Sequence, residues 1–256
     1  MDSLAINNLN FSYDQKSILS DINLNIDSGS FTGIIGPNGS GKTTLAKLIS
    51  KLLKADKNTV AINDMDINDI KISELAKFMA MVPQASSVNY DLTVYEVVLM
   101  GRTPHLKRFQ RESDEDFKIV KEVMEETDTW IFRDRLIHQL SGGERQRVII
   151  ARTLAQEPKI LILDEPVTYL DIHHQLQIMS LIKKLSTTRK MTIIMILHDL
   201  NYALTYCDHV VLLSDGKVFK HGHPGDVVTI EHIKSVYDID VSIINHPVTE
   251  KPMVVF

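Results

Sequence analysis

The sequence predicts an α/β fold with a buried parallel sheet, and three patterns lead to that prediction. A glycine-rich loop at residues 36–43 stands between an apolar run and a segment with helical spacing of apolar residues. A second apolar run, residues 159–163, ends in two acids and suits a strand buried on both faces. Residues 1–30 instead alternate apolar and polar side chains, which is typical of antiparallel strands.

The first half of the chain combines these antiparallel strands with the strand and helix that flank the loop. Alternation resumes near residues 58–65, where further antiparallel pairing is expected. Residues 31–35 predict the strand that enters the loop, and residues 44–53 predict the helix that leaves it. This strand–loop–helix order is the context in which a glycine-rich loop binds phosphate.

The second half predicts a helical region followed by further strands. Residues from about 87 to 155 show helical patterns and no clear strand. Strands are expected at residues 192–197 and 209–213, and the Ser-Asp-Gly-Lys sequence at residues 214–217 predicts a hairpin turn. The segment from residue 225 is short and mixed, which argues against an independent regulatory domain.

Composition narrows the class of protein. The chain has 256 residues, 44% of them hydrophobic, so a single domain over residues 1–256 can bury a sizeable core. A net charge of −5 argues against nucleic-acid binding, which favours a basic surface. The single cysteine, Cys207, excludes an intrachain disulfide and is expected to pack in a helix. No segment has the pattern of a signal peptide or of a membrane span.

Residues 36–43 match the pattern G-x-x-x-x-G-K-[ST] of a phosphate-binding loop. Glycine tolerates positive φ and lacks Cβ, so backbone amides can converge on a triphosphate at the start of a helix. Lys42 is expected to reach the β- and γ-phosphates, and Thr43 to ligate Mg²⁺. The alternative is a glycine-rich turn with a chance lysine, which the flanking strand and helix disfavour. The predicted ATP-binding residues here are Gly36, Pro37, Asn38, Gly39, Ser40, Gly41, Lys42, Thr43 and Thr44.

A phosphate-binding loop alone is compatible with many functions, and a second motif narrows the choice. This motif is residues 140–147, Leu-Ser-Gly-Gly-Glu-Arg-Gln-Arg. At this point the chain resembles the ATP-binding cassette (ABC) family, whose signature begins Leu-Ser-Gly-Gly followed by Gln or Glu. The residues alone predict that Ser141 N-caps a helix, and a serine with two glycines there also suits a γ-phosphate. The resemblance implies that this signature acts on nucleotide held by a second subunit. Its residues are Ser141, Gly142, Gly143 and Glu144.

Asp164 and Glu165 end the apolar run of residues 159–163. Ligands of open α/β sheets bind beyond the carboxyl ends of the strands, where these acids are expected to lie. Asp164 is expected to hold Mg²⁺, directly or through water, and Glu165 to polarise the attacking water as the general base. The structural alternative is a pair of carboxylates that caps a turn before Pro166.

The family resemblance implies roles for three further residues. Gln84 matches the Q-loop glutamine, which senses Mg²⁺ and the γ-phosphate and faces the membrane partner. His198 matches the switch histidine that contacts the γ-phosphate. Tyr13 matches the aromatic residue that stacks on adenine. A histidine after a strand is otherwise a core or cap residue, and a strand tyrosine is otherwise simple packing.

The segment after the two acids departs from the family pattern D-E-P-T-S-x-L-D. Val167 removes a hydroxyl group and Thr168 stands where serine is common, whereas Asp171 of this D-loop is retained. Because both acids are intact, hydrolysis is expected, while the coupling across a dimer stays open. His173 and His174 are expected to begin a helix after Asp171 rather than to bind a metal.

The resemblance covers nearly the whole chain and implies the fold of a P-loop NTPase ABC nucleotide-binding domain. Such a domain has a RecA-like core, an antiparallel β subdomain (about 1–30 and 58–65), an α-helical subdomain (about 87–155) and here a short tail. Residues 91–105 and 169–172 are similar to importer ATPases for iron–siderophore, haem and cobalamin complexes, with iron–siderophore the first choice.

An importer of this kind implies ATP and Mg²⁺ as cofactors and a second copy of the chain as an ATP-dependent dimer partner. It also implies permease subunits in the membrane and, indirectly, an extracellular or periplasmic substrate-binding protein. Gln84 and the segment from Tyr90 to Arg102 are expected to face the permease, on the cytoplasmic side of the membrane. The alternatives are a soluble cassette ATPase of translation or DNA repair and an exporter or cell-division cassette. Two acidic stretches, residues 112–116 and 122–126, are expected on solvated helix faces.

Overall fold

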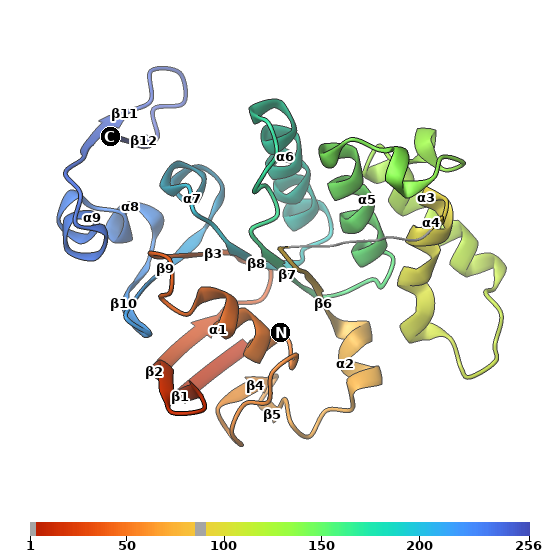
Figure 1. Ribbon diagram of the computed structural model, residues 1–256, viewed down its shortest axis with the longest axis horizontal. Coiled ribbons are helices and arrows are strands. Elements are labelled where there is room, and N and C mark those ends of the chain that lie inside the picture. Colours follow the sequence, from red (N-terminus) through yellow and green to blue (C-terminus); the bar gives the residue numbers. More distant parts are fainter. Residues whose placement is uncertain (1–3, 85–90) are drawn as a thin grey trace. The chain divides into compact units, whose positions relative to one another are not determined.

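The computed structural model describes residues 4–84 and 91–256, and contacts within the chain divide it into two compact units. Unit 1 joins residues 1–70 to residues 192–256, and unit 2 consists of residues 71–191. Unit 1 therefore contains the red and blue ends of the chain in Figure 1. No helix in the described part of the chain has both the length and the apolar character that a membrane crossing needs.

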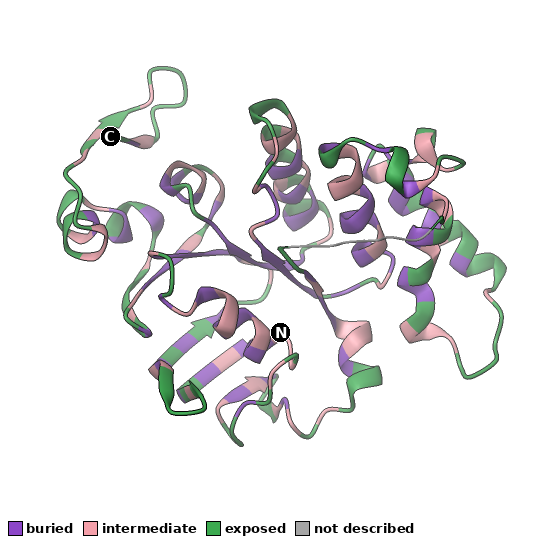
Figure 2. Ribbon diagram, in the orientation of Figure 1, coloured by how far each residue is buried: buried purple, intermediate pink, exposed green. Residues whose placement is uncertain are grey.

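An antiparallel sheet occupies the start of unit 1. β1 (Leu4–Tyr13) pairs with β2 (Lys16–Ile26) on one side and with β4 (Val60–Ile62) on the other, and β5 (Met65–Asp66) completes the sheet. Buried and exposed residues alternate along β1 and β2 (Figure 2), because successive side chains of a strand point to opposite faces. The antiparallel strands expected in residues 1–30 and 58–65 are confirmed.

Three parallel strands form the centre of unit 1. β3 (Phe31–Ile35) lies between β8 (Thr192–Ile196) and β9 (His209–Ser214) and runs parallel to both. Every residue of β3 and β8 is buried, as expected for apolar strands covered on both faces. β10 (Lys217–Gly222) returns antiparallel to β9 through a turn in which Asp215 and Gly216 have positive φ, which confirms the predicted hairpin.

Two helices of unit 1 begin beyond the carboxyl ends of parallel strands. α1 (Lys42–Ile49) follows the glycine-rich loop and is shorter than the helix expected over residues 44–53. It ends early because Lys51 adopts a left-handed φ of 60°, which a continuing helix cannot contain. α7 (Leu200–Tyr206) follows β8, and Cys207 lies one residue beyond α7, so its predicted place inside a helix is wrong by that residue.

The C-terminal part of unit 1 contains more regular secondary structure than the sequence pattern indicated. α8 (Pro224–Val227) and α9 (Ile230–Tyr237) precede a hairpin of β11 (Ser242–Asn245) and β12 (Pro252–Val255). The side chain of Asn201 bonds to both backbone groups of Val254, accepting at 2.7 Å and donating at 3.1 Å. An amide side chain thus acts as a strand partner and attaches the hairpin to α7.

Unit 2 contains a parallel strand pair and a long helix. α2 (Ile72–Phe78) leads into β6 (Met79–Val82), which pairs in parallel with β7 (Ile160–Asp164). All five residues of β7 are buried, which confirms the strand expected over residues 159–163. α6 (Ile172–Thr188) begins directly after Asp171, its N-cap, so the helix start predicted at His173 and His174 is confirmed.

The rest of unit 2 is helical between residues 91 and 155, as expected, whereas Tyr90 lies outside the described residues. Side chains fix several helix starts: Thr93 with Glu96 and Ser113 with Asp116 form reciprocal capping boxes. The elements are α3 (Val94–Leu99), η1 (Met100–His105), α4 (Asp114–Glu126), η2 (Trp130–Phe132), η3 (Ile137–Gln139) and α5 (Gly142–Leu154).

A buried arginine, Arg102, connects three of these segments by hydrogen bonds. Its burial and that of Asp116 contradict two expectations from the sequence. Arg102 donates from Nε to Asp116 (2.8 Å) and from Nη1 to Glu157 (2.8 Å) and to the carbonyl of Ala155 (2.6 Å). Asp116 was expected on a solvated face and Arg102 on a surface toward the permease, yet both are buried. A buried charge needs a charged and hydrogen-bonded partner, and each of these residues supplies it for the other.

The buried pair predicts a pH dependence of stability. Burial raises the pKa of Asp116, but hydrogen bonds from Ser113 and Arg102 outweigh it and lower the pKa from 3.8 to about 2. The ionised Asp116 therefore stabilises the fold fully at pH values above the pKa that this carboxyl has in the unfolded chain. This stabilisation is lost as pH falls from about 4 to about 2. We expect the urea unfolding free energy to fall less steeply over this range in Asp116→Asn than in the wild type. Asp114→Asn, an exposed neighbour on α4, should keep the wild-type slope, and equal slopes in all three proteins would contradict the prediction.

Candidate functional site

The glycine-rich loop of unit 1 connects β3 to α1 and is curled around a lysine. Gly36, Gly39 and Gly41 have φ values of 149°, 82° and 100°, a region that residues with a Cβ rarely adopt. The ammonium group of Lys42 donates to the carbonyl oxygens of Gly36 and Pro37, both at 2.9 Å. The predicted loop geometry and the inward position of Lys42 are therefore present in the folded chain.

A buried hydroxyl in this loop supports the binding of an anion. Ser40 is 2% exposed, and its Oγ has no hydrogen-bond partner among the described residues. Buried polar groups normally have a partner, so this donor, the loop amides and the charge of Lys42 together suit a phosphate group. The hydroxyl of Thr43, at the start of α1, is the kind of oxygen ligand that Mg²⁺ accepts. The residues present therefore fit a nucleoside triphosphate with a divalent cation.

Tyr13 and His198 also belong to unit 1. Tyr13 ends β1 with 45% of its surface exposed, and its ring meets Phe11 edge-on with centroids 4.9 Å apart. His198 is exposed after the carboxyl end of β8, and Asp199 then caps α7 by accepting a hydrogen bond from the amide of Asn201 (2.7 Å). The strand-end position of His198 is as predicted, and the contact of either side chain with nucleotide stays a prediction.

The two acids of unit 2 lie where β7 ends. Asp164 is 2% exposed, whereas the chain turns at Glu165, which has a φ of 52°. One oxygen of the Glu165 carboxylate accepts hydrogen bonds from Gln84 Nε2 (2.5 Å) and from Thr168 Oγ1 (3.2 Å). The structure thus brings Gln84 and Glu165 together, and it gives Thr168 a role as a donor that fixes the carboxylate. The sequence showed Thr168 only as a departure from the family pattern.

The signature residues form the N-terminus of α5 in unit 2. The hydroxyl of Ser141 accepts from the amide of Glu144 (3.3 Å), and the carboxylate of Glu144 accepts from the amide of Ser141 (2.8 Å). The Ser141 amide holds the pKa of Glu144 below its usual value. Ser141 and Gly142 are exposed and Gly143 is buried. The predicted N-cap is confirmed, and the positive end of a helix is accessible at Ser141.

Asp171 has the same function at the next helix. Its carboxylate accepts from the backbone amide of His174 (2.9 Å) and lies 2.7 Å from the ring Nδ1 of that residue. Within the part of the chain that is described, no group of three or more His, Cys, Asp or Glu side chains could hold a metal ion.

One residue near the loop was missed by the sequence patterns. Burial raises the pKa of Tyr237 on α9 to about 12, while a hydrogen bond with the backbone of Gly36 acts in the opposite direction. Tyr237 is separated from Gly36 by most of the chain and carries no motif. Only the packing of α9 within unit 1 places it beside the loop.

The geometry of the loop predicts how ATP affinity responds to alanine at Gly36 and at a control glycine. A Cβ on Gly36 would lie 2.2 Å from the carbonyl oxygen of Leu213, so Gly36→Ala must displace the loop. Gly222 has a nearly identical φ of 150°, but a Cβ there would meet only Val227, at 3.8 Å. We expect isothermal calorimetry to show a loss of ATP affinity of at least about tenfold in Gly36→Ala. Gly222→Ala should bind ATP normally, and unchanged affinity in Gly36→Ala would contradict the assignment of the loop.

Comparison with known proteins agrees with this geometry. Residues 19–168 match the family described as ABC transporter. The chain is 41% identical over 253 residues to the iron(3+)-hydroxamate import ATP-binding protein FhuC of Bacillus subtilis, covering 99% of this chain and 94% of that protein. It is 37% identical over 247 residues to the ferric enterobactin transport ATP-binding protein FepC of Escherichia coli, covering 96% and 91%.

Solved structures give the same result. The dimeric structure of a bacterial ABC transporter cassette superposes with a TM-score of 0.75 at 32% identity, covering 86% of this chain and 98% of that one. The fold predicted from the phosphate-binding loop, the signature and the two acids is therefore confirmed. The chain belongs to the ABC transporter family and is an ATP-binding ATPase of that family.

Proposed function

We propose that this chain hydrolyses ATP to drive the import of an iron–siderophore complex, or of a related iron chelate, haem or cobalamin. The observation that carries the proposal is the end-to-end similarity, 41% over 99% of the chain, to a protein named for iron(3+)-hydroxamate import. Two copies would work on the cytoplasmic face of a membrane permease. A substrate-binding protein outside the membrane would deliver the cargo to that permease.

Binding of the nucleotide is assigned to residues with distinct chemistry. The loop amides, Ser40 and Lys42 would hold the phosphates, and Tyr13 would stack on adenine. Mg²⁺ would be held by Thr43, Gln84 and Asp164 and would supply positive charge at the β- and γ-phosphates. His198 would contact the γ-phosphate. The buried Oγ of Ser40, which has no hydrogen-bond partner among the described residues, supports this assignment.

Hydrolysis is assigned to Glu165 as the general base. Its carboxylate would take the proton of the water that attacks the γ-phosphate. Gln84 and Thr168 both donate to one carboxylate oxygen, which fixes the orientation of the whole carboxylate. A base that is already oriented needs less reorganisation in the transition state.

The signature is assigned to the nucleotide of the second copy. Ser141 and Gly142 are exposed at the N-terminus of α5, where the helix dipole favours an anion. A relative that was solved as a dimer supports such an arrangement. ATP bound in the loop of one copy would thereby draw the two copies together, and hydrolysis would let them separate.

A surface of unit 2 suits the permease. Tyr95 on α3 is half-buried and meets Trp130 edge-on with centroids 6.3 Å apart, and Ile131 beside it is 75% exposed. Lys121 and Arg133 lie over the Trp130 ring at 5.6 and 5.1 Å. Exposed apolar side chains next to cationic groups fit an amphipathic helix from a partner. This surface would contact the permease and would not touch the transported molecule. The class of cargo is therefore inferred from the relatives.

The test of the whole proposal is affinity purification of the tagged chain from its own membranes. We expect an importer-type permease to co-purify and the matching substrate-binding protein to bind a ferric siderophore. Recovery of an exporter, a cell-division protein or ribosomes instead would contradict the importer assignment.

Glu165→Gln should separate binding from hydrolysis. We expect kcat to fall by about 10²–10⁴-fold, the range for loss of a general base, while MgATP affinity is kept. The variant should elute as an ATP-bound dimer in size-exclusion chromatography. Glu115→Gln, an exposed acid on α4, serves as the control and should match the wild type. Near-normal turnover in Glu165→Gln would assign the base to another residue.

Tyr95→Asp should uncouple the chain from its permease. A charge placed where an apolar helix must dock costs about 1–3 kcal/mol, so permease pull-down, transport and permease-stimulated ATPase should fall together. ATP binding by the isolated chain should persist. Phe109→Asp changes a 91% exposed aromatic residue elsewhere in unit 2 and should have no effect. Retained assembly and transport in Tyr95→Asp would place the permease contact elsewhere.

A further inference from the structure

The imidazole ring of His174 lies directly against Gly143 of the signature. A Cβ built on Gly143 would come within 2.1 Å of His174 Cδ2 and 2.4 Å of Cγ, which are distances that no real side chain allows. Gly143 is not among the residues with positive φ, so a side chain there is excluded by this ring and not by backbone conformation. The neighbouring Gly142 differs, because its Cβ would meet only Leu170, at an ordinary 3.5 Å.

Asp171 fixes the position of this ring. One carboxylate oxygen accepts from the His174 backbone amide, and the other lies 2.7 Å from ring Nδ1, which must be the donor because a carboxylate only accepts. Gln175 then donates to the carbonyl oxygens of Leu170 (3.0 Å) and Val167 (3.3 Å). The first turn of α6 is thus bonded to the D-loop on one side, while its His174 ring packs on the signature on the other.

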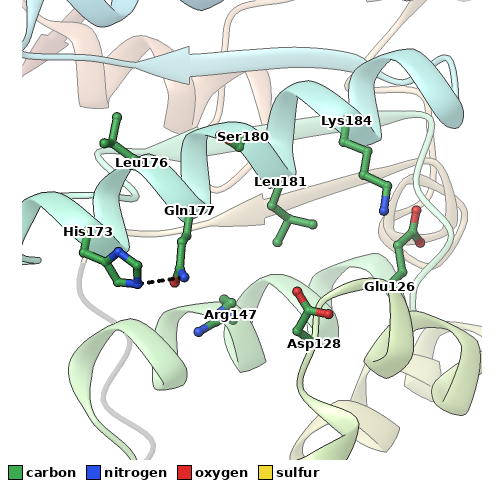
Figure 3. A pocket seen from close by; sticks show the side chains of 9 residues that line it. All are labelled: Glu126, Asp128, Arg147, His173, Leu176, Gln177, Ser180, Leu181 and Lys184. Carbon is green, nitrogen blue, oxygen red and sulfur yellow. Dashed lines mark hydrogen bonds between the residues drawn. The ribbon is translucent and has the colours of Figure 1, made fainter.

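The adjacent histidine provides a natural control. His173 faces a groove of about 390 Å³ between α5 and α6, where its Nε2 lies 2.9 Å from Nε2 of Gln177 (Figure 3). Its ring is inclined by 78° to that of His174, with centroids 5.6 Å apart. Two histidines at consecutive positions therefore have different surroundings, and the three atoms nearest to a Cβ built on Gly143 all belong to His174.

We propose that His174 is a positioning residue that couples the D-loop to the signature. The inference rests on the proposed action of the signature on the second copy's nucleotide. Asp171 holds the ring and the ring sets the place of Gly143, so displacement of the D-loop moves the N-terminus of α5. A close-packed contact transmits such a shift, because packed atoms have no free space to absorb it. Binding of ATP to the chain's own loop does not depend on this contact.

The test uses the clash that the structure predicts. Gly143→Ala should lower kcat for ATP hydrolysis by about 10–100-fold, the cost of misplacing a reacting group by about 1 Å. Affinity for ATP in the chain's own loop should not change, so the effect falls on kcat and not on binding. His174→Ala removes the obstructing ring together with the contact that positions the signature, so alone it should lower kcat, though less than Gly143→Ala does. The double variant Gly143→Ala/His174→Ala should be rescued from the Gly143→Ala rate up to that of His174→Ala. His173→Ala should hydrolyse ATP at the wild-type rate and should not rescue Gly143→Ala.

Three results would overturn the proposal: normal hydrolysis in Gly143→Ala, no rescue in the double variant, or equal rescue by His173→Ala. If Gly143→Ala does not fold, folding becomes the measurement, and recovery of the native thermal transition in the double variant supports the contact while its absence refutes it.

Ser141→Asp distinguishes this inference from the proposed function. Aspartate also caps a helix, so the fold is kept, but it places a negative charge toward the partner's γ-phosphate. Normal hydrolysis in Ser141→Asp would refute the shared site itself. Loss of hydrolysis there, together with no rescue in the double variant, would refute only the role of His174.

Discussion

The complete burial of the central strands is the constraint on which the rest of this structure depends. β3 lies between two parallel neighbours, and none of its residues reaches solvent, so polar chemistry is confined to the loop at its carboxyl end. That end must turn sharply, which explains the positive φ of Gly36 and its close approach to the carbonyl of Leu213. The loop amides, Ser40 and Lys42 are thereby gathered before any ligand arrives, and such preorganisation lowers the cost of binding phosphate.

In unit 2 a fully buried strand likewise confines polar groups to its carboxyl end, but here those groups are two acids and the helix ends that follow. β7 is equally buried and ends in two acids, one held in the interior and the other held by Gln84 and Thr168. The helices that follow are fixed by side-chain caps at Ser141 and Asp171, which satisfy backbone donors that a helix leaves unpaired. Each cap is also a residue to which we assign function, so the groups that stabilise these helix ends are the groups that present them to a partner.

Short sequence patterns were enough to predict most of the proposed site and many of the strands. The loop, the acids, the signature helix and the alternating strands are encoded by neighbouring residues, because their chemistry depends on short spacing along one strand, turn or helix end. The same reasoning failed for Arg102 and Asp116. Arg102 is expected on the permease-facing surface from its place in the segment Tyr90 to Arg102, and Asp116 on a solvated face from its acidic stretch. Both are buried because each neutralises the other across 14 positions of sequence. Charge alone does not reveal a partner that only packing supplies.

The sequence by itself determined the family, the phosphate-binding loop and the strand-end acids, since these depend on residues that are adjacent in the chain. The tertiary structure alone decided that Thr168 supports Glu165, that Tyr237 lies beside Gly36 and that the ring of His174 occupies the space above Gly143. The physical reason is that each of these contacts depends on the direction of a turn or on the packing of a helix. Periodicity records which face of an element is buried, but it does not record which side chain from another element fills the space against it.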